Sequence, residues 1–386
     1  MKILKKHIKT NQNITTTRYV FGPVCVLKKI SSKTFNKTFL FGIRIGYKNK
    51  IIENKLNFCE LFSTGKTEPD FPIDIIIPVY NGYEYLDDLF TSVYENTDLK
   101  YHLIVVNDAS PDERVLPLLK KYKKQFGKKM TLINNPENLG FIKSVNSALS
   151  QTTNHVALIN TDVILPKNWA SKLFTPIYLD NTVATVTPFS NNATIFSLPK
   201  ILENDLMGDL DLINCELSKI NTPFEKIKLP TGVGFCMAMN KNAIKSVGYF
   251  DTIFGRGYCE ENDWCMRAIN HGYYNTIAAN MLVWHKHGAS FGPEKQKLIQ
   301  QNEKKLLDRH PTYNKFVQKT LCNNYFMPLR FIGELLYLSV IDKSKLQITI
   351  TPQQNEKYIL TYKYENLENH ITVSKSDYNK LLKHLK

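Results

Sequence analysis

The first fifty residues contain no aspartate and no glutamate. They carry ten lysines and two arginines, which supply +12 of the formal net charge of +15 of the 386-residue chain. A segment of one charge sign is typical of contact with an acidic surface, either anionic lipid or nucleic acid, although a solvated arm has the same composition. The sequence predicts that residues 1–70 form a basic N-terminal arm, or a set of short strands.

Long apolar runs are also lacking. A transmembrane helix needs about 18 consecutive apolar residues, and no stretch of the sequence approaches that length. No apolar run of signal-peptide length follows the N-terminal lysines. The seven cysteines are odd in number and scattered, which favours reduced thiols over a disulfide framework. We expect a globular cytoplasmic protein, with peripheral attachment to the inner face of the cell membrane left open.

From residue 71 onward, two kinds of apolar pattern alternate. Continuous apolar runs, typical of strands buried on both faces, are separated by segments whose apolar residues recur at helical spacing. The expected strands are residues 73–80, 102–108, 130–135 and 155–162, and the expected helices are residues 81–97, 112–126 and 140–150. This order of βαβ units predicts an α/β fold with a mainly parallel sheet flanked by helices.

Polar residues stand where three of these strands end. Pro78, Tyr80 and Asn81 close the first strand, Asp108 closes the second, and Asp162 closes the fourth. Ligands of such sheets bind beyond the carboxyl ends of the strands. We therefore expect these residues to converge on one ligand.

Glycine-rich phosphate cradles are absent from the sequence. The turn PVYNGYEY has one glycine and lacks the G-x-G-x-x-G dinucleotide motif. Residues 65–67 (GKT) imitate the end of a P-loop, but Glu60 stands where its first glycine belongs. Without such a cradle a bound diphosphate needs another neutraliser, and a divalent metal ion held by carboxylate oxygens is the simplest one.

Seven blocks of sequence, taken in order, point to one family. They are IIIPVYNGYEYLDDLFTSV, VVNDASPD, NPENLGFIKSVNSAL, LINTDVILPKNW, GVGFCMAMNKNAIKSVGYFD, GRGYCEENDWCMRAINHGY and WHKHGASFG. Over residues 71–292 the chain thereby resembles the family 2 glycosyltransferases of the bacterial polysaccharide and glycoconjugate type, with the Rossmann-like GT-A fold. The resemblance implies a GT-A domain at residues 71–310 and a small C-terminal extension at residues 311–386.

The resemblance also implies an activity. Such a protein is an inverting transferase that moves a sugar from a nucleotide-diphosphate sugar to a hydroxyl of a glycan, lipid-linked or protein acceptor. Surface polysaccharide or glycoconjugate biosynthesis is the expected setting.

The donor and metal residues follow from the matching blocks. By resemblance, Pro78, Tyr80, Asn81 and Asp108 bind the donor nucleotide. Residues 160–162 match the metal-binding D-x-D block with Asn160 in place of the first acid, so that Asp162 alone supplies a carboxylate, and His285 is the third metal or diphosphate contact. The implied cofactor is Mg²⁺ or Mn²⁺, with weaker binding because of Asn160.

The acceptor residues are expected in the sequence CEENDW. The resemblance places the catalytic base at Glu261, with Asp263 as its rival. Glu260, Gly234 and Trp264 are expected to contact the acceptor or the sugar. Each has a structural alternative: acids in the first turn of a helix are favoured by its dipole, glycine serves turns, and tryptophan packs in cores.

Three other interpretations remain open. Cys259, Cys265, His285 and His287 could hold zinc, although the cysteine spacing is not that of common zinc sites. The basic arm, with six aromatic residues interleaved, could bind nucleic acid, although no RNA-binding motif accompanies it. A catalytically impaired GT-A domain could serve as a binding partner, for which Asn160 is the best support.

Overall fold

The computed structural model describes most of the chain, namely residues 5–11, 14–21, 24–31, 36–40, 43–47, 54–57, 61–62, 68–201, 208–286 and 295–385. The chain divides into two compact units. The larger unit comprises Phe58–Tyr313 and Ile332–Lys345, and the smaller one comprises Met1–Asn57, Asn314–Phe331 and Leu346–Lys386. The division at residues 70 and 310 that the sequence suggests stays a prediction.

The larger unit is built on an eight-stranded sheet in the order β10-β13-β11-β12-β9-β6-β7-β8. Its strands are β6 (Ile73–Val79), β7 (Tyr101–Asn107), β8 (Met130–Asn134), β9 (His155–Ile159), β10 (Val163–Ile164), β11 (Val183–Ser190), β12 (Cys236–Met239) and β13 (Tyr274–His285). Strands β9, β6, β7 and β8 are mutually parallel, as are β11 and β13, whereas β12 and β10 run antiparallel to their neighbours. The expected strands and the mixed, mainly parallel sheet are confirmed.

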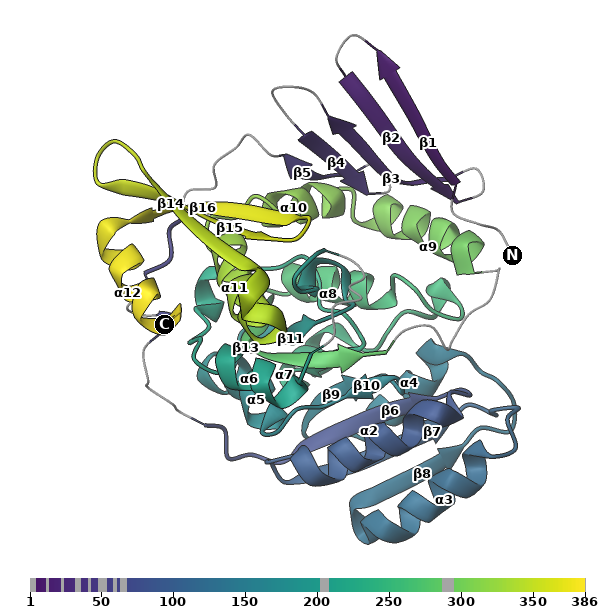
Figure 1. Ribbon diagram of the computed structural model, residues 1–386. Helices are drawn as coiled ribbons and strands as arrows, with labels where there is room; N and C mark the ends of the chain where they lie inside the picture. Colours follow the sequence, from purple (N-terminus) through teal and green to yellow (C-terminus); the bar gives the residue numbers. More distant parts are fainter. Residues whose placement is uncertain are drawn as a thin grey trace. The chain divides into compact units, whose positions relative to one another are not determined.

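Helices flank this sheet (Figure 1). They are α2 (Tyr83–Asn96), α3 (Val115–Phe126), α4 (Phe141–Leu149), α5 (Trp169–Leu179), α6 (Leu210–Leu217), α7 (Lys241–Val247), α8 (Glu260–Asn270) and α9 (Lys295–Arg309). Nearly all of α10 (Tyr313–Thr320) belongs to the smaller unit, and α11 (Phe326–Asp342) is divided between the two units. In α2 the buried residues Leu86, Leu89 and Val93 recur at helical spacing. The three helices predicted from the sequence are therefore present as α2, α3 and α4.

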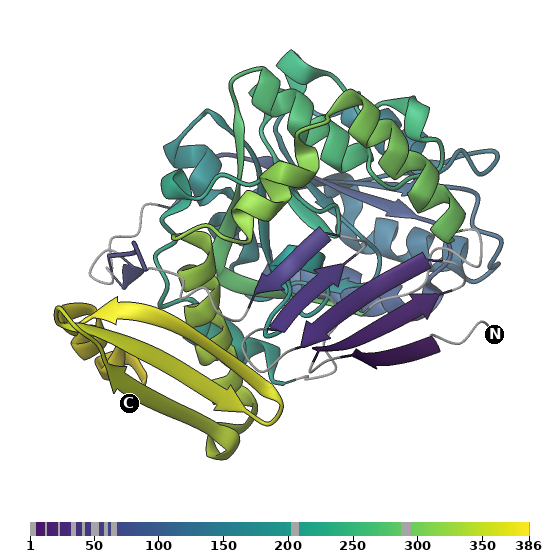
Figure 2. The same cartoon turned by 90° about the horizontal axis from the view of Figure 1, so that it is seen from above.

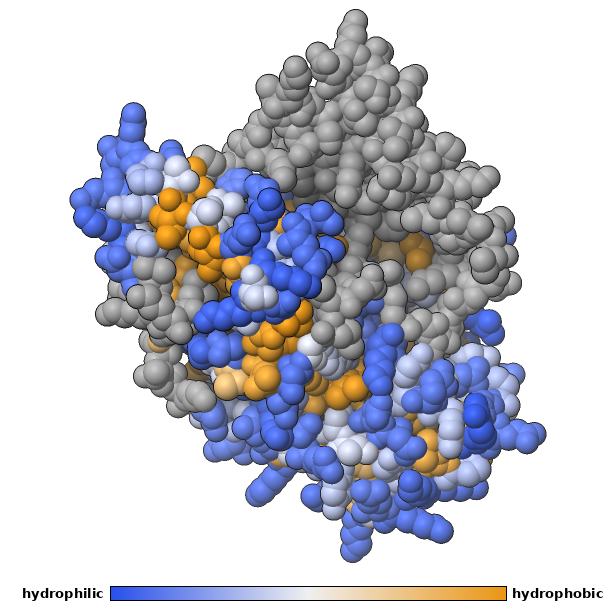
Figure 3. Space-filling model, in the orientation of Figure 1, coloured by the Kyte–Doolittle hydropathy of each residue, from blue (hydrophilic) through white to orange (hydrophobic). Residues whose placement is uncertain are grey.

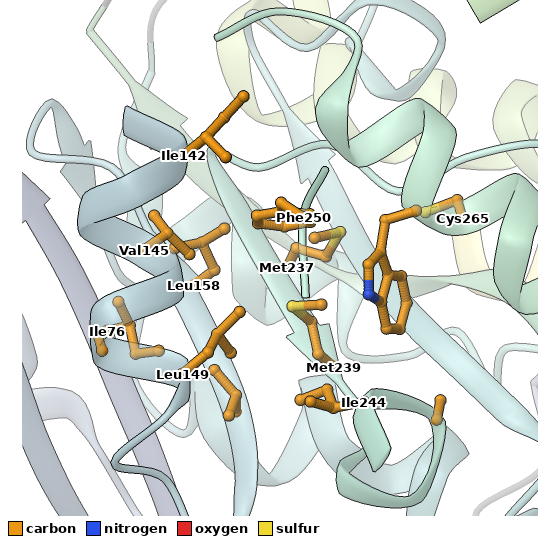
Figure 4. Packing of buried hydrophobic residues seen from close by; sticks show 14 of the residues in the cluster. Ile76, Ile142, Val145, Leu149, Leu158, Met237, Met239, Ile244, Phe250 and Cys265 are labelled. Carbon is orange, nitrogen blue, oxygen red and sulfur yellow. The ribbon is translucent and has the colours of Figure 1, made fainter. Parts of the chain in front are cut away.

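Residues of the first strand alternate between the two faces of the sheet, and both faces are buried. Ile76 points toward α4, where it joins a core cluster with Val145 and Leu149 of that helix and with Leu158 and Met237 of the neighbouring strands. Figure 4 shows these side chains meeting between the helix and the sheet. Burial on both faces explains why the strand sequences are continuous apolar runs.

The smaller unit contains two antiparallel sheets. One has the strands β1 (Lys5–Asn11), β2 (Ile14–Phe21), β3 (Val24–Ser31), β4 (Asn36–Leu40) and β5 (Ile43–Tyr47) in sequential order. The other has β14 (Leu346–Pro352), β15 (Lys357–Tyr364) and β16 (Leu367–Ser374), the yellow strands of Figure 2, followed by α12 (Lys375–Leu385). The basic N-terminal region therefore contains strands.

Hydrophilic residues cover much of the described surface on the face shown in Figure 3. Helix α3 illustrates the pattern, because Leu118, Leu119 and Tyr122 are buried whereas Lys120 and Lys121 face solvent. Across the described ranges, none of the helices is both long and apolar enough to span a bilayer.

Candidate active site

The ends of β6 and β7 are joined by hydrogen bonds at the carboxyl edge of the sheet. Asn81 adopts a left-handed conformation (φ 59°), its backbone N–H donates to Ser110 Oγ (3.0 Å), and its Oδ1 accepts from the Asp112 N–H (3.3 Å). Next to it, Tyr80 is 37% exposed and Pro78 is half-buried. The expected donor residues of the first strand therefore lie together, with the Tyr80 ring open to a ligand.

Asp108 holds a neighbouring turn instead of facing outward. It is 3% exposed; its Oδ1 accepts from Asn135 Nδ2 and the Leu139 N–H (2.8 Å each), and its Oδ2 accepts from the Gly140 N–H (2.8 Å). Both carboxylate oxygens are thus used by the protein. This geometry makes Asp108 a positioning residue for residues 135–140, and its contact with the donor nucleotide stays a prediction.

The turn that Asp108 holds reaches the loop before α8. Gly140 has φ +83°, and a Cβ added to it would lie 3.3 Å from the Arg256 Cα. Glycine is therefore required at this position for its conformation and for the close approach of the two backbones. The turn between β8 and α4 and the loop that leads into α8 are packed against each other.

Asp162 and His285 meet at the same edge of the sheet. The short strand β10 pairs antiparallel with the end of β13, with Val163 opposite His285, and this pairing brings Asp162 Oδ1 to 3.3 Å from His285 Nε2. The side chains are 9% and 14% exposed, respectively. The structure therefore brings together two of the three predicted metal or diphosphate ligands.

Several residues fix the orientation of the His285 ring. Asn191 accepts from the His285 N–H (2.8 Å) and donates to its carbonyl oxygen (3.1 Å), while His285 Nδ1 lies 2.7 Å from the Asn192 carbonyl oxygen. The ring also stacks on Phe235, with the centroids 5.3 Å apart and an interplanar angle of 17°. Because a carbonyl oxygen only accepts, Nδ1 carries a proton, and this sets the tautomer of the ring.

The tautomer of His285 decides whether its Nε2 atom can bind a metal ion. In a neutral His285, the Nε2 lone pair faces a carboxylate oxygen of Asp162, so that two acceptors approach each other. Either a proton on Nε2 or a cation beside both atoms relieves the repulsion. Metal-binding histidines commonly donate their other N–H to a carbonyl oxygen, as His285 does. The donor set of Asp162 and His285 therefore fits a divalent cation.

Asn160, the third predicted ligand, is tied to the same region through its backbone. Its backbone N–H donates to the Phe235 carbonyl oxygen (2.9 Å), which places it beside the ring that stacks on His285, and its side chain is half-buried. Within the described ranges, no group of three or more His, Cys, Asp and Glu side chains forms a metal cluster. A metal ion here would need the amide oxygen of Asn160, water or the substrate as further ligands.

The candidate base lies at the start of α8, after a loop in an unusual conformation. Gly255, Gly257, Tyr258 and Cys259 all have positive φ, which is costly for the two residues that carry a Cβ. The fully buried amide of Asn302, on α9, donates to the carbonyl oxygens of Phe254 (2.7 Å), Gly257 (2.8 Å) and Tyr258 (3.1 Å). Helix α9 thereby holds the loop in this conformation.

Glu261 is half-buried, and the backbone N–H of Gly234 is close enough to act on its carboxylate. Burial raises the pKa of Glu261 above its usual value. For Glu260, which is 4% exposed, burial and the neighbouring charge of Glu261 raise the pKa well above the usual value. Gly234 is thus placed beside the predicted base, and a carboxylate of raised pKa is suited to accept a proton.

Asp263, the rival base, is enclosed by two arginines and a histidine. It is fully buried; Oδ2 accepts from Arg267 Nε (2.8 Å), and Oδ1 contacts Arg309 Nη1 and His310 Nε2 (2.9 Å each). A carboxylate held in this way has no position left for an acceptor hydroxyl. The geometry favours Glu261 as the base and gives Asp263 the role of joining α8 to the end of α9.

Trp264 lies in the core and not at the site, which corrects the predicted acceptor contact. The side chain is fully buried, its Nε1 donates to the Gly248 carbonyl oxygen (2.8 Å), and its ring packs edge-on against Phe250. A ring without exposed surface has no face for a sugar. Of the alternative zinc ligands, His287 lies outside the described residues.

Sequence reasoning missed the residues that support the site. Asn191, Asn192 and Phe235 orient His285, and Asn302 anchors the loop before α8. The two asparagines at 191 and 192, which come directly after a buried strand, are a usable signal because polar residues at strand ends gather at the ligand edge. Asn302 lies in a helix of polar sequence, and nothing in that sequence indicates its buried position.

Comparisons with known proteins assign the fold first. The chain resembles GalNAc-T7 solved with UDP, GalNAc and Mn²⁺, at a TM-score of 0.50 and 14% identity, over 76% of this chain and 65% of that one. At this identity the likeness shows the fold alone, which is the expected GT-A fold: a mainly parallel sheet between helices.

The family follows from the sequence. Residues 74–248 match the family model for glycosyl transferase family 2, which confirms the expected resemblance over this part of the chain. An uncharacterized glycosyltransferase of Haemophilus influenzae is 32% identical over 104 residues, which are 27% of this chain and 32% of that protein. N-acetylgalactosaminyltransferase 7 of Drosophila melanogaster is 30% identical over 126 residues, 30% of this chain and 21% of that protein. The chain thus matches at most about a third of the length of these relatives.

The enclosure of Asp263 predicts a difference in stability. Asp263→Asn should lower the free energy of unfolding by on the order of 3 kcal/mol, because it leaves Arg267 and Arg309 without their buried counter-charge. Asp112→Asn is the control, since Asp112 pairs with Arg114 at the surface and its loss should change stability little. Urea unfolding measures both, and equal stabilities of the two variants would contradict the structural role of Asp263.

Proposed function

We propose that this protein is an inverting glycosyltransferase that moves a sugar from a nucleotide-diphosphate sugar to an acceptor hydroxyl. The observation that carries the proposal is the placement of the Asp162–His285 pair at the carboxyl edge of the sheet, in a chain that resembles family 2 glycosyltransferases. The start of α8 supplies the other requirement, a carboxylate suited to take a proton. GalNAc-T7, which has a similar fold, was solved with UDP and Mn²⁺ and supports the choice of donor and metal.

Each group has a distinct task in the proposed reaction. Tyr80 and Asn81, with Pro78, form the rim on which the nucleotide lies. Asp162 and His285, with the amide oxygen of Asn160, would hold Mg²⁺ or Mn²⁺, which when bound neutralises the charge that develops on the leaving diphosphate. Glu261 takes the proton of the acceptor hydroxyl as the oxygen attacks. A base acting on the face opposite the leaving group gives inversion, which NMR of the product would establish from its anomeric configuration.

The acceptor is proposed as a glycan, lipid-linked or protein hydroxyl in surface polysaccharide or glycoconjugate biosynthesis.

A second candidate function is that of a catalytically impaired GT-A domain that serves as a binding partner, and the replacement of an acid by Asn160 favours it. A thermal-shift screen of nucleotide sugars, with and without Mn²⁺, would identify the donor. The retained carboxylates Asp162 and Glu261 favour the enzyme.

Removing the metal ligand should abolish transfer. Asp162→Ala deletes the only carboxylate of the proposed metal set, so transfer should fall to background while the melting temperature stays near that of the wild type. Chelator should inactivate the wild type, and added Mn²⁺ should restore it. Full activity of Asp162→Ala, or wild-type activity in excess chelator, would rule out the metal at this place.

Removing the base should slow the chemistry without weakening donor binding. Glu261→Gln should lower turnover by about 10²–10⁴-fold, since that is the usual contribution of a positioned base. Donor affinity, measured by calorimetry, should change little. The wild-type rate should rise with pH through a value above the usual glutamate pKa of 4.5, because burial raises the pKa of Glu261 and the base acts when deprotonated. Wild-type turnover in Glu261→Gln would refute the assignment.

We further propose that the N-terminal region attaches the protein to an anionic membrane surface, where lipid-linked acceptors lie. Twelve cations and no acid in fifty residues motivate the proposal. Each lysine or arginine near such a surface contributes about 1 kcal/mol, and the attraction is screened by salt. A few engaged cations are therefore enough for reversible attachment.

The membrane proposal has a matched test. Replacing Lys5, Lys6 and Lys9 by glutamine should weaken binding to vesicles that contain phosphatidylserine by about 100-fold, at about 1 kcal/mol per charge. Replacing Lys120, Lys121 and Lys124 of α3 removes the same charge elsewhere and should have little effect. Co-sedimentation at low and high salt measures both. Equal binding of the two variants would refute attachment through this region, and a preference for RNA over vesicles would assign it to nucleic acid.

A further inference from the structure

The first residue of α4, Phe141, lies between the loop before α8 and the segment before β12. A Cβ added to Gly257, in that loop, would lie 3.8 Å from the Phe141 Cβ, and one added to Gly234 would lie 3.9 Å from the Phe141 Cζ. The side chain thus reaches from the loop before α8, at its base, to Gly234, at its tip. It is half-buried, so part of its surface is accessible.

The segment before β12 connects the start of α8 with the candidate metal site. At one end of this segment, Asn262 Nδ2, in the first turn of α8, donates to Thr231 Oγ1 (2.8 Å). At the other end, the Phe235 ring stacks on the His285 ring. The glycine that the tip of the Phe141 side chain approaches is the residue directly before Phe235. Phe141 therefore stands between the helix that carries the proposed base and the pair that would hold the metal.

Helices α4 and α8 pack on the same face of the sheet. Val145 and Leu149 of α4 and Cys265 of α8 belong to one core cluster with Met237 of the sheet, as Figure 4 shows. Helix α4 follows the parallel strand β8, so its first residue stands at the carboxyl edge of the sheet. Phe141 packs against the core cluster from that edge, which is where the ligands of such sheets bind.

The proposed reaction determines where the transferred sugar has to lie. Its anomeric carbon must stand between the acceptor oxygen, beside Glu261, and the leaving diphosphate oxygen, beside Asp162 and His285. One face of a pyranose ring consists largely of C–H groups, and an aromatic side chain offers apolar surface to such a face. The position of Phe141 between the two groups matches this requirement.

We propose that Phe141 is the surface on which the pyranose ring of the donor lies, so that it contributes to affinity for the sugar and not for the nucleotide. The inference rests on the proposed function and adds to it a residue that binds the transferred sugar. The alternative role for Phe141 is packing against the core alone. A packing residue would not distinguish a nucleotide sugar from the nucleoside diphosphate that it contains.

Calorimetry on Phe141→Leu separates the two roles, because leucine keeps an apolar side chain and removes the aromatic face. The probes are UDP-glucose, UDP-N-acetylgalactosamine, GDP-mannose and dTDP-rhamnose, and UDP, GDP and dTDP alone, all with Mn²⁺. For the nucleotide sugar that the wild type binds most tightly, the dissociation constant should rise by about tenfold, since apolar contact with the sugar is lost. The dissociation constant of the corresponding nucleoside diphosphate should not change.

Two further variants complete the comparison. Phe141→Met fills the space with a flexible apolar chain and should behave as Phe141→Leu does. Tyr273→Leu is the matched control, because Tyr273 is a half-buried aromatic residue that packs against the same core cluster beyond the end of α8. It should leave both dissociation constants at their wild-type values. Equal weakening of nucleotide sugar and nucleoside diphosphate in the Phe141 variants, or unchanged binding of both, would overturn the proposal.

NMR of the wild type tests the contact without any substitution. Saturation of the aromatic protons of the protein should transfer to the C–H groups on one face of the bound sugar. Transfer to the nucleotide protons alone would also overturn the proposal. A wild type that binds neither the nucleotide sugars nor the nucleoside diphosphates contradicts the proposed function, and this inference with it. A wild type that binds them, with sugar affinity independent of Phe141, contradicts the inference alone.

Discussion

The candidate site depends on the pairing of one strand with two neighbours. Strand β13 runs parallel to β11 for most of its length and antiparallel to β10 at its end. The pairing with β10 brings His285 close to Asp162, although the two residues are far apart in the sequence. Both side chains are polar and would otherwise be hydrated. Asn191, at the end of β11, adds two hydrogen bonds to the backbone of His285. Backbone pairing thus offsets the cost of gathering polar side chains at a buried edge.

A second set of contacts determines where Glu261, the proposed base, lies. Consecutive left-handed residues such as Tyr258 and Cys259 persist only when neighbouring groups hold them. The amide of Asn302 supplies both of its N–H donors to carbonyl oxygens of this segment, and Arg309 and His310 bind Asp263 one turn into the helix. The start of α8 is therefore fixed by α9 from one side and by the sheet from the other.

The strands and helices from residue 71 to residue 162 could be predicted from the sequence, because their apolar patterns reflect burial in a sheet covered on both faces. The meeting of Asp162 and His285 at the ligand edge was accessible through resemblance. The hydrogen-bond partners of Asp108, Asp263 and Trp264 could not be predicted from the sequence. Each side chain points toward partners contributed by distant segments, such as the turn at 135–140 for Asp108, the end of α9 for Asp263 and the Gly248 carbonyl oxygen for Trp264. Sequence spacing carries no information on such partners.

The stretch that matches the family model ends at residue 248, before α8, β13 and α9 begin. Glu261, His285 and Asn302 all lie beyond that point. A fragment that ended at residue 248 would keep Asp162 and lose β13, the strand that pairs beside it, together with several residues of the core cluster that α4 joins, among them Phe254 and Trp264. The part of the chain that matches the family model is therefore shorter than the compact unit that contains the candidate site, and two of the proposed site residues, Glu261 and His285, lie outside the matched part.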